Sequence, residues 1–338
     1  MPVTCASNNL PVLFLYNLDP NWDEQDVQAA LSSNQRMSEA LQEAGHPVVS
    51  AALSDSDLPS LLSRFSPRDL IVFNQCEGIP GIPYSEHEAV RIIESFGFSY
   101  TGSSPDVLLL TGDKAETKRI LASRNIPTPS GQIYDKPVAD DWASFPAIVK
   151  TTREHCSLSL SQESVVLNRR ELEARIQFIL TNYRQPALVE DFIDGREFHV
   201  PVWGNSAVSV LPAVEMDFSE CLDVHDRLCT YDAKFAPDSR DYNIIKTLIP
   251  APLSEDARQT LERVSLNAYR ALGCRDYARL DIRERNGEFF VLDVNPNADL
   301  DIEASIACSA EHTGYSYAQM MTHLVRLAAH RHPLYSRP

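Results

Sequence analysis

Short apolar runs and amphipathic segments alternate through the first hundred residues of the chain. The apolar runs predict four buried strands, at residues 12–16, 48–52, 70–73 and 98–101. The amphipathic segments between them predict helices at residues 35–44, 58–65 and 86–96. Strands that alternate with helices form a parallel sheet covered on both faces, so an N-terminal α/β domain is expected. The residues after the first strand, 17–21, contain no glycine-rich fingerprint, which disfavours a NAD-binding fold.

The pattern changes near Gly102-Ser103-Ser104-Pro105, a stretch of turn-forming residues. Beyond it, helices are predicted at residues 107–110, 114–125 and 171–180, and a strand at residues 147–151. From residue 187 strand patterns dominate, at residues 188–191, 197–203 and 207–211. Two further helices are predicted at residues 254–272 and 317–330. We therefore expect three parts, formed by residues 1–103, 104–187 and 188–338.

A polar hairpin is predicted between the last two helices. Two apolar runs, residues 277–282 and 289–294, flank a turn that contains Asn286-Gly287, the strongest short turn signal. Residues two apart on a strand face the same side, so one surface can gather Arg279, Asp281, Asp293 and Asn295. Carboxylate and amide oxygens suit Mg²⁺. An edge hairpin with a solvated polar face is the alternative interpretation.

Composition is that of a globular protein, with 43% hydrophobic and 23% charged residues in a chain of 338. The 47 acidic and 30 basic side chains give a formal net charge of -17. This excess of acids argues against nucleic acid and anionic membranes as partners, because both are bound through Lys and Arg. A nucleotide site is not excluded, since it needs only a few local cations.

The seven cysteines are scattered, and none forms a Cys-x-x-Cys pair. Neither a zinc site nor a disulfide framework is therefore predicted, and most of the thiols are expected to be buried in a reducing cytosol. The sequence shows no secretory signal pattern and no apolar run of membrane-spanning length. A cytoplasmic location is expected.

The run Leu292-Asp293-Val294-Asn295-Pro296 resembles the metal-binding end of the ATP-grasp ligases, in which a carboxylate, any residue and Asn follow one another. Further segments, in the same order along essentially the whole chain, resemble D-alanine–D-alanine ligases. The resemblance implies an ATP-grasp fold with an N-terminal Rossmann-like parallel-sheet domain, a small central subdomain and a larger antiparallel-sheet C-terminal subdomain. It also implies that Asp281, Asp293 and Asn295 hold Mg²⁺ (or Mn²⁺) on the phosphates of ATP.

The resemblance assigns three lysines to ATP. Lys114, after Gly112-Asp113, and Lys150, at the end of an apolar run, match the family's two phosphate-binding lysines. Lys234, in Tyr231-Asp232-Ala233-Lys234, matches the lysine that closes over the γ-phosphate. The alternatives are an ordinary surface lysine for Lys114 and a lysine that merely reaches solvent from a strand end for Lys150.

The segment 188–198 is similar to the family's adenine hinge. The resemblance implies that Glu190 and the backbone as far as Ile193 read the adenine edge, and that Glu197 accepts hydrogen bonds from the ribose hydroxyls. A sheet hairpin with exposed acids is the alternative. Glu24 corresponds to a glutamate that meets the amino group of the family's first substrate, and its alternative is a solvated helix start.

Two segments depart from the family pattern. In the phosphate loop, residues 151–159, His155 and Leu158 stand where the family has glycines, which stiffens the loop. His155 and Cys156 are candidates for substrate contact, and a catalytic Cys-His pair is disfavoured because adjacent strand residues point to opposite faces. The segment 296–301 lacks the Ser and Gly that hold the second D-alanine and carries Asp299 and Asp301, which favour a cationic amine.

We therefore expect an ATP-dependent carboxylate–amine ligase that is similar to D-alanine–D-alanine ligase but acts on other small molecules. A substrate carboxylate would attack the γ-phosphate to give an acyl phosphate, and an amine would then displace phosphate. Lys234 would neutralise the phosphates and Arg279 would hold the developing oxyanion. A non-catalytic nucleotide-binding or regulatory protein on the same fold is the alternative. A homodimer is compatible with the sequence.

Overall fold

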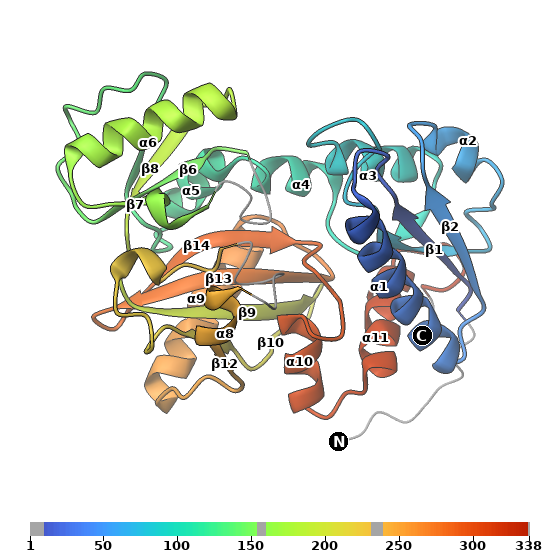
Figure 1. Ribbon diagram of the computed structural model, residues 1–338. Helices are drawn as coiled ribbons and strands as arrows, with labels where there is room; N and C mark the ends of the chain where they lie inside the picture. Colours follow the sequence, from blue (N-terminus) through green and yellow to red (C-terminus); the bar gives the residue numbers. More distant parts are fainter. Residues whose placement is uncertain (1–9, 154–159, 231–238, 337–338) are drawn as a thin grey trace.

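The computed structural model describes residues 10–153, 160–230 and 239–336, which form three sheets (Figure 1). The first sheet is parallel and has the strand order β2-β1-β3-β4. Its strands are β1 (Val12–Asn17), β2 (Val48–Leu53), β3 (Ile71–Gln75) and β4 (Ser99–Tyr100). Each overlaps one of the predicted apolar runs, so the prediction of an N-terminal parallel sheet is confirmed.

Helix α1 (Glu24–Glu43) begins well before residue 35, where the sequence pattern predicted its start. Asp23 caps it, because its side chain accepts a hydrogen bond from the backbone nitrogen of Asp26 at 2.9 Å. The buried residues of α1 lie only in its second half, as Met37 and Leu41 do. The apolar periodicity therefore marked that half alone. The next two predicted helices form as α2 (Leu58–Leu62) and α3 (Glu86–Ser95).

The first sheet takes one of its covering helices from a distant part of the sequence. Helix α11 (Tyr317–Ala329) contacts α1, β3 and β4, and it lies beside α1 in Figure 1. Leu324 of α11 shares one hydrophobic core with Phe14 and Phe73 of the sheet. A separate core under α2 and α3 covers the other face.

The second sheet is antiparallel and has the order β5-β8-β6-β7. Its strands are β5 (Gly131–Tyr134), β6 (Ala147–Thr151), β7 (Val165–Val166) and β8 (Ala187–Asp191). Helix α6 (Arg169–Asn182) packs against it through a hydrophobic core. Helices α4 (Pro105–Thr111) and α5 (Lys114–Ser123) connect the first sheet to this part of the molecule (Figure 1).

The third sheet is the largest, with the order β12-β11-β9-β13-β14 and with β10 paired to β9. Its strands are β9 (Arg196–Gly204), β10 (Val208–Val210), β11 (Val214–Asp217), β12 (Lys246–Leu248), β13 (Tyr277–Arg285) and β14 (Glu288–Pro296). The helices that follow its strands are α8 (Arg240–Ile244), α9 (Glu255–Ala271) and α10 (Ser305–His312). Among all helices of the described ranges, none is both long and apolar enough to cross a membrane.

The predicted polar hairpin is confirmed as β13 and β14, which pair from Ala278 to Arg285 with one shift of register between Asp281 and Ile282. Asn286 and Gly287 both have positive φ, 57° and 82°. A two-residue turn with positive φ at both positions matches the right-handed twist of the strands, which is why the Asn-Gly signal was reliable here.

Asp276, directly before β13, ties the parts of the molecule together. Its buried carboxylate accepts hydrogen bonds from the backbone nitrogen of Gly102 at 2.9 Å and from Asn205 Nδ2 at 3.0 Å. Arg331, just after α11, donates to both oxygens of Asp276 at 2.7 and 2.6 Å, and to the carbonyl of Tyr100 at 2.6 Å. One carboxylate thus joins the first sheet, the third sheet and the end of α11.

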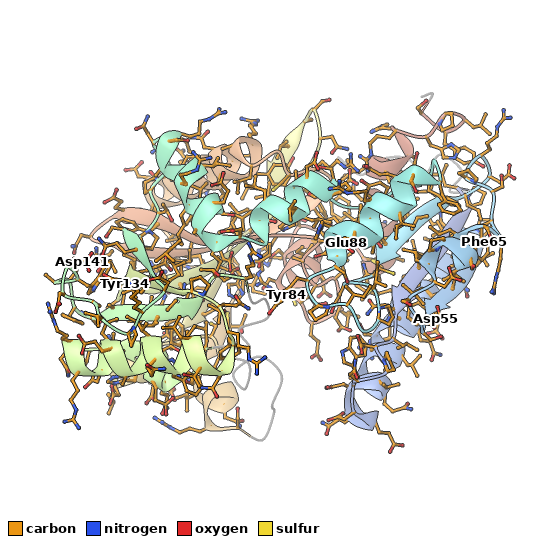
Figure 2. The ribbon with its side chains drawn as sticks, turned by 90° about the horizontal axis from the view of Figure 1, so that it is seen from above. Asp55, Phe65, Tyr84, Glu88, Tyr134 and Asp141 are labelled. Atoms are coloured by element: carbon orange, nitrogen blue, oxygen red, sulfur yellow. The ribbon has the colours of Figure 1, made fainter. Side chains whose placement is uncertain are left out.

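A second connection links the first and second sheets. Tyr84 lies in the loop between β3 and α3, and Figure 2 shows it between the N-terminal elements and the second sheet. Gln185 Nε2 donates to the Tyr84 hydroxyl at 2.8 Å, and Gln185 Oε1 accepts from the backbone nitrogen of Arg153 at 3.1 Å. Gln185, just before β8, therefore connects the loop after β3 to the segment that follows β6.

Candidate functional site

The β13–β14 hairpin carries four polar side chains on one face. Asp281 is paired with Asp293 across the two strands, and Arg279 with Asn295. Residues directly opposite each other in an antiparallel pair project to the same side, so the prediction that the hairpin gathers them is confirmed. Asn295 Nδ2 donates to Asp281 Oδ2 at 3.1 Å.

Both carboxylates of this face contact a cation. Arg279 donates to the two oxygens of Asp281, from Nε at 2.7 Å and from Nη2 at 3.0 Å. Lys114 Nζ lies 2.8 Å from Asp293 Oδ2. Burial would lower the pKa of Lys114, but the charge of Asp293 and its hydrogen bond outweigh burial and raise it. Lys114 is therefore charged at neutral pH.

Two lysines share one buried carboxylate near the end of β8 in the second sheet. Lys118 Nζ lies 2.6 Å from Glu190 Oε1, and Lys150 Nζ lies 3.1 Å from Glu190 Oε2. Burial alone would raise the pKa of Glu190, but the two positive charges lower it. The cluster has one positive charge more than its single anion neutralises. Such an excess suits an anionic ligand.

A pocket lies beside these groups, where residues of the second and third sheets face each other. Its uncharged lining comes from Pro129, Ile148, Leu160, Phe192, Ile193, Leu228, Cys229 and Leu292. Its charged lining comes from Lys150, Glu190, Asp191, Glu197, Asp281, Arg283 and Asp293. A pocket that combines apolar walls with charged groups suits a ligand with both apolar and anionic parts. A second hollow, on the outer side of α9, involves none of these residues.

Glu197 is buried and held by Arg283. Arg283 Nε donates to Glu197 Oε2 at 2.7 Å, and Arg283 Nη1 donates to the carbonyl of Ile193 at 3.1 Å. Burial would raise the pKa of Glu197, but the charge of Arg283 and contact with His199 hold it well below its usual range. The carboxylate is therefore ionised, and Arg283 fixes both Glu197 and the chain at Ile193.

The hairpin face fits a magnesium ion by the chemistry of its donors. Asp281, Asp293 and Asn295 offer carboxylate and carboxamide oxygens on one surface. Mg²⁺ prefers oxygen ligands and is usually held by one or two carboxylates together with water and phosphate oxygens. These three residues would hold the ion beside the pocket, which Asp281 and Asp293 line.

The chain is similar to known proteins over most of its length. A family model described as the C-terminus of D-ala D-ala ligase matches residues 132–326, more than half of the chain. The chain is 30% identical over 311 residues to a D-alanine–D-alanine ligase of Marinomonas sp. (strain MWYL1), covering 89% of this chain and 91% of that protein. This chain belongs to the D-alanine–D-alanine ligase family. It is also 34% identical over 302 residues to the uncharacterized protein y4sG of Sinorhizobium fredii (strain NBRC 101917 / NGR234), covering 87% and 86% of the two chains.

The fold is that of the family. A crystal structure of D-alanine–D-alanine ligase from Bacillus anthracis complexed with ATP matches with a TM-score of 0.72, over 94% of this chain and 97% of that one, at 16% identity. The prediction of an ATP-grasp fold is therefore confirmed.

The other residues that the sequence predicted for the site lie in separate parts of the chain. Glu24 is the exposed first residue of α1. Ile193 is buried and lines the pocket. His155, Cys156 and Lys234 lie outside the described residues, and their roles stay predictions.

Asp299 joins an acidic group that the sequence did not predict. Burial raises the pKa of Asp299, although its side chain remains in contact with solvent. Partial withdrawal from solvent, together with the charge of Asp299, raises the pKa of Glu77, although Glu77 is an exposed residue. Burial raises the pKa of Glu86 to about 8, against the effect of Asn297 Nδ2, which donates to it at 2.9 Å. The surroundings of these three acids disfavour negative charge and would favour a cation.

Asp301, the other acid of segment 296–301, is instead bound by α1. Arg36 Nη2 and Ser33 Oγ both donate to Asp301 Oδ2 at 2.6 Å. Asp301 therefore connects this segment to the first helix, and its charge is neutralised locally.

Three site residues escaped sequence reasoning for different reasons. Lys118 is four residues after Lys114, on the same helical face, and this spacing was a usable signal. Arg283 is two residues after Asp281 on β13, so the two side chains project to the same face of that strand. The register with β14 shifts between Asp281 and Ile282. His199 stands opposite Asp281 on β9, and only the pairing of β9 with β13 brings the two together.

Proposed function

We propose that this chain is an ATP-dependent ligase that joins a carboxylate to an amine through an acyl phosphate. The observation that supports this most directly is the meeting of two groups at one pocket. The two-lysine cluster around Glu190 lies on one side, and the oxygen donors of the β13–β14 hairpin lie on the other.

The pocket suits ATP in one orientation. Phe192 and Ile193 offer an apolar wall for adenine, and Glu197 offers a carboxylate for the ribose hydroxyls. Lys114 and Lys150 would then meet the phosphates as point charges. Lys234 would complete this set from the segment outside the described residues. Bound Mg²⁺ would neutralise charge on the transferring phosphoryl group.

The proposed chemistry has two steps. The substrate carboxylate attacks the γ-phosphorus, the bond to ADP breaks, and an acyl phosphate forms. The amine then attacks the acyl carbon, and the carbon–oxygen bond to phosphate breaks as the amine loses its proton. Arg279 would stabilise the oxyanion of the second step, and its two hydrogen bonds to Asp281 orient the guanidinium beforehand.

The amine substrate is proposed to be cationic. Asp299, Glu77 and Glu86 all have raised pKa values, because withdrawal from solvent disfavours their ionised forms. The charge of Asp301 adds to this effect at Asp299, that of Asp299 at Glu77, and that of Glu77 at Glu86. An ammonium group among them would relieve this cost, whereas a second carboxylate would add to it. D-alanine is therefore expected to be a poor second substrate.

Product mass tests this proposal. The protein is incubated with Mg²⁺, ATP and an amino acid that serves as the carboxylate substrate. One candidate amine is added to each sample: D-alanine, a diamine or a basic amino acid. Products with basic amines are expected in the wild type, and Asp299→Asn is expected to lose this preference. Asp301→Asn is the matched control, because Asp301 already pairs with Arg36. Efficient D-alanyl-D-alanine synthesis by the wild type would contradict the substrate class.

The metal assignment has a separate test. Asp293→Ala should abolish Mg²⁺-dependent turnover and leave the circular dichroism spectrum unchanged, since Asp293 is half-buried and packs no core. Full activity of Asp293→Ala at saturating Mg²⁺ would contradict a metal-binding role.

A nucleotide-binding protein without ligase activity is the second candidate. The absence of glycine at residues 155 and 158 favours it, because glycines let a loop's backbone approach phosphates closely. ATP binding without ADP formation, across the whole amine panel, would support this alternative.

A further inference from the structure

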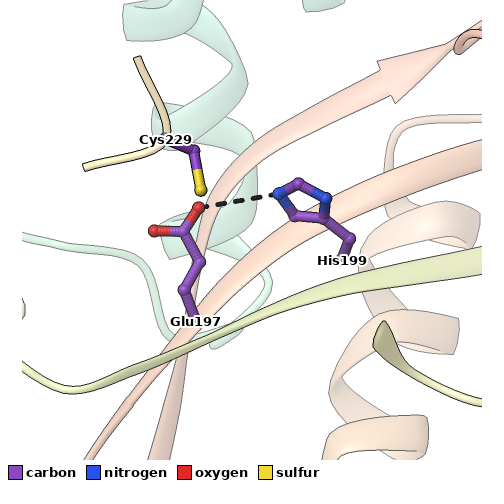
Figure 3. Close-up of side chains that lie close together, drawn as sticks. All are labelled: Glu197, His199 and Cys229. Atoms are coloured by element: carbon purple, nitrogen blue, oxygen red, sulfur yellow. Dashed lines mark ion pairs between the residues drawn. The ribbon is translucent and has the colours of Figure 1, made fainter. Parts of the chain in front are cut away.

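Three side chains with different donor atoms meet beside the pocket (Figure 3). Glu197 and His199 are two residues apart on β9, so they project from the same face of the third sheet. Cys229 approaches them from the segment after the 3₁₀ turn Val224–Asp226. A carboxylate oxygen, an imidazole nitrogen and the sulfur lie within 4.8 Å of one another, and all three residues are buried.

The two nitrogens of His199 have unequal surroundings. Nδ1 lies 3.2 Å from Ser305 Oγ, within hydrogen-bonding distance. Nε2 is buried, and the described atoms offer it no hydrogen-bond partner. It lies 3.6 Å from Glu197 Oε1 and 3.9 Å from Asp281 Oδ1. With the proton on Nδ1, Nε2 presents its lone pair toward two carboxylate oxygens, and a cation placed among these three atoms would bind all of them.

Glu197 is oriented so that one oxygen remains directed at this point. Arg283 binds Oε2 at 2.7 Å, whereas the shorter approach to His199 Nε2 is made by Oε1. In a tetrahedral site with metal–ligand bonds of about 2.0–2.3 Å, ligand atoms are roughly 3.3–3.8 Å apart. The separation of 3.6 Å between Oε1 and Nε2 falls within this range.

We propose that Glu197, His199 and Cys229 form a site for a thiophilic divalent cation such as Zn²⁺, and that its occupation excludes the nucleotide. Sulfur, nitrogen and carboxylate oxygen together suit Zn²⁺ and Co²⁺. The hairpin face, in contrast, provides only oxygen ligands, which suit Mg²⁺. On binding, the cysteine thiol loses its proton to solvent and the metal–sulfur bond forms. The spacing of cysteines along the sequence could not reveal this site, because its ligands come from separate segments and only one of them is a cysteine.

Competition with the nucleotide follows from shared residues and rests on the function proposed above. Glu197 and Cys229 both line the pocket that contains Lys150 and Glu190. A metal on Glu197 would occupy the oxygen proposed to bind the ribose, and its bond to Cys229 would place the ion at the wall of the same pocket.

Co²⁺ absorption tests the site on the full-length, metal-free protein. A thiolate-to-Co²⁺ charge-transfer band in the near ultraviolet is expected in the wild type, and one equivalent of Zn²⁺ should abolish it. Cys229→Ser should lose the band and Cys308→Ser should keep it, because Cys308 is the half-exposed thiol of α10, outside this group. His199→Gln keeps the thiol and should weaken Co²⁺ binding at least tenfold. Absence of the band in the wild type, or its persistence in Cys229→Ser, overturns the site.

Calorimetry tests the exclusion. Mg²⁺-ATP is titrated into metal-free protein and into protein preloaded with one equivalent of Zn²⁺ and then desalted. Zn²⁺ should raise the Kd for ATP at least tenfold in the wild type and leave it unchanged in Cys229→Ser. Equal affinities in the two wild-type samples would overturn the exclusion. Failure of ATP to bind the metal-free protein would instead overturn the proposed function, and the Co²⁺ band would still decide the metal site.

Discussion

At the scale of one residue, Glu190 determines the charge balance of the pocket between the second and third sheets. It is completely buried, and its two oxygens contact two different lysines. A buried ion pair costs desolvation energy, so its net stabilisation is small, but removing one partner leaves a buried charge without compensation. Here the loss of one carboxylate would leave two such charges.

Glu190→Gln should therefore lower the free energy of unfolding by about 3 kcal/mol at pH 7. Urea unfolding followed by tryptophan fluorescence measures this change. Glu288→Gln is the control, because Glu288 is exposed at the start of β14 and should change stability by less than about 0.5 kcal/mol. Equal stabilities of the two variants would show that Lys118 and Lys150 do not depend on Glu190.

Glu86 should make the protein less stable as pH rises. Its folded pKa of about 8 exceeds the ordinary value of 4.5, because burial disfavours the charged form. Between these two pH values the folded state binds more protons than the unfolded state, so the free energy of unfolding falls with increasing pH. Glu86→Gln should remove this slope and gain at least about 1 kcal/mol relative to the wild type between pH 5 and pH 8.

Urea unfolding at several pH values measures the effect of Glu86→Gln. Its exposed helix neighbour Glu88 supplies the control variant Glu88→Gln, which should keep the wild-type slope. A slope unchanged in Glu86→Gln would contradict a raised pKa for Glu86.

Residue-scale prediction from the sequence succeeded where partners are close in the chain. Arg279 and Asp281 are two residues apart on one strand, so their contact followed from strand geometry alone. Lys118 and Glu190 lie on separate elements, α5 and β8, and no local pattern connects them. The same holds for His199 and Cys229, whose proximity depends on how the segment after β11 folds over the third sheet.

Helix α5 shows how an element positions a functional group. Asp113 is its N-cap and accepts a hydrogen bond from the backbone nitrogen of Glu116 at 3.0 Å. Lys114 is the next residue, and its backbone nitrogen donates to the carbonyl of Thr152 at 3.1 Å. The cap therefore fixes the place from which the Lys114 side chain reaches Asp293.

Asp113→Ala should lower the free energy of unfolding by about 1 kcal/mol and also weaken ATP binding severalfold. Asp57→Ala is the matched control, because Asp57 caps α2 in the same way and lies in the N-terminal part. The control should lose stability and keep its ATP affinity, as measured by urea unfolding and calorimetry. Unchanged ATP binding in Asp113→Ala would contradict a positioning role for the cap.

Elements were predicted well where the pattern and the turn signals were local. The β13–β14 hairpin has alternating positions and an Asn-Gly turn, and both determine its register. Strands β5 and β7 were missed because they are only four and two residues long, and β5 is mostly exposed. Such strands form because neighbouring strands offer hydrogen bonds, and their own sequence does not reveal this.

At the scale of the whole molecule, Asp276 and Arg331 connect the parts that the sequence divided. Arg331→Met should leave the buried carboxylate of Asp276 without its cation and lower the free energy of unfolding by about 3 kcal/mol. Arg124→Met, at an exposed site just after α5, is the control and should change stability by less than about 0.5 kcal/mol. Urea unfolding decides, and equal midpoints for the two variants would contradict a joining role for the pair.

The packing of α11 on the first sheet has a consequence for synthesis on the ribosome. Strand β1 and helix α1 are among the first segments to emerge, but α11 is translated long afterwards. Until then, the side chains of Phe14 and Phe73 lack the helix that completes their core. Nascent chains would expose this hydrophobic surface throughout elongation. Chaperones that bind exposed hydrophobic surfaces are therefore expected to bind these chains during that interval.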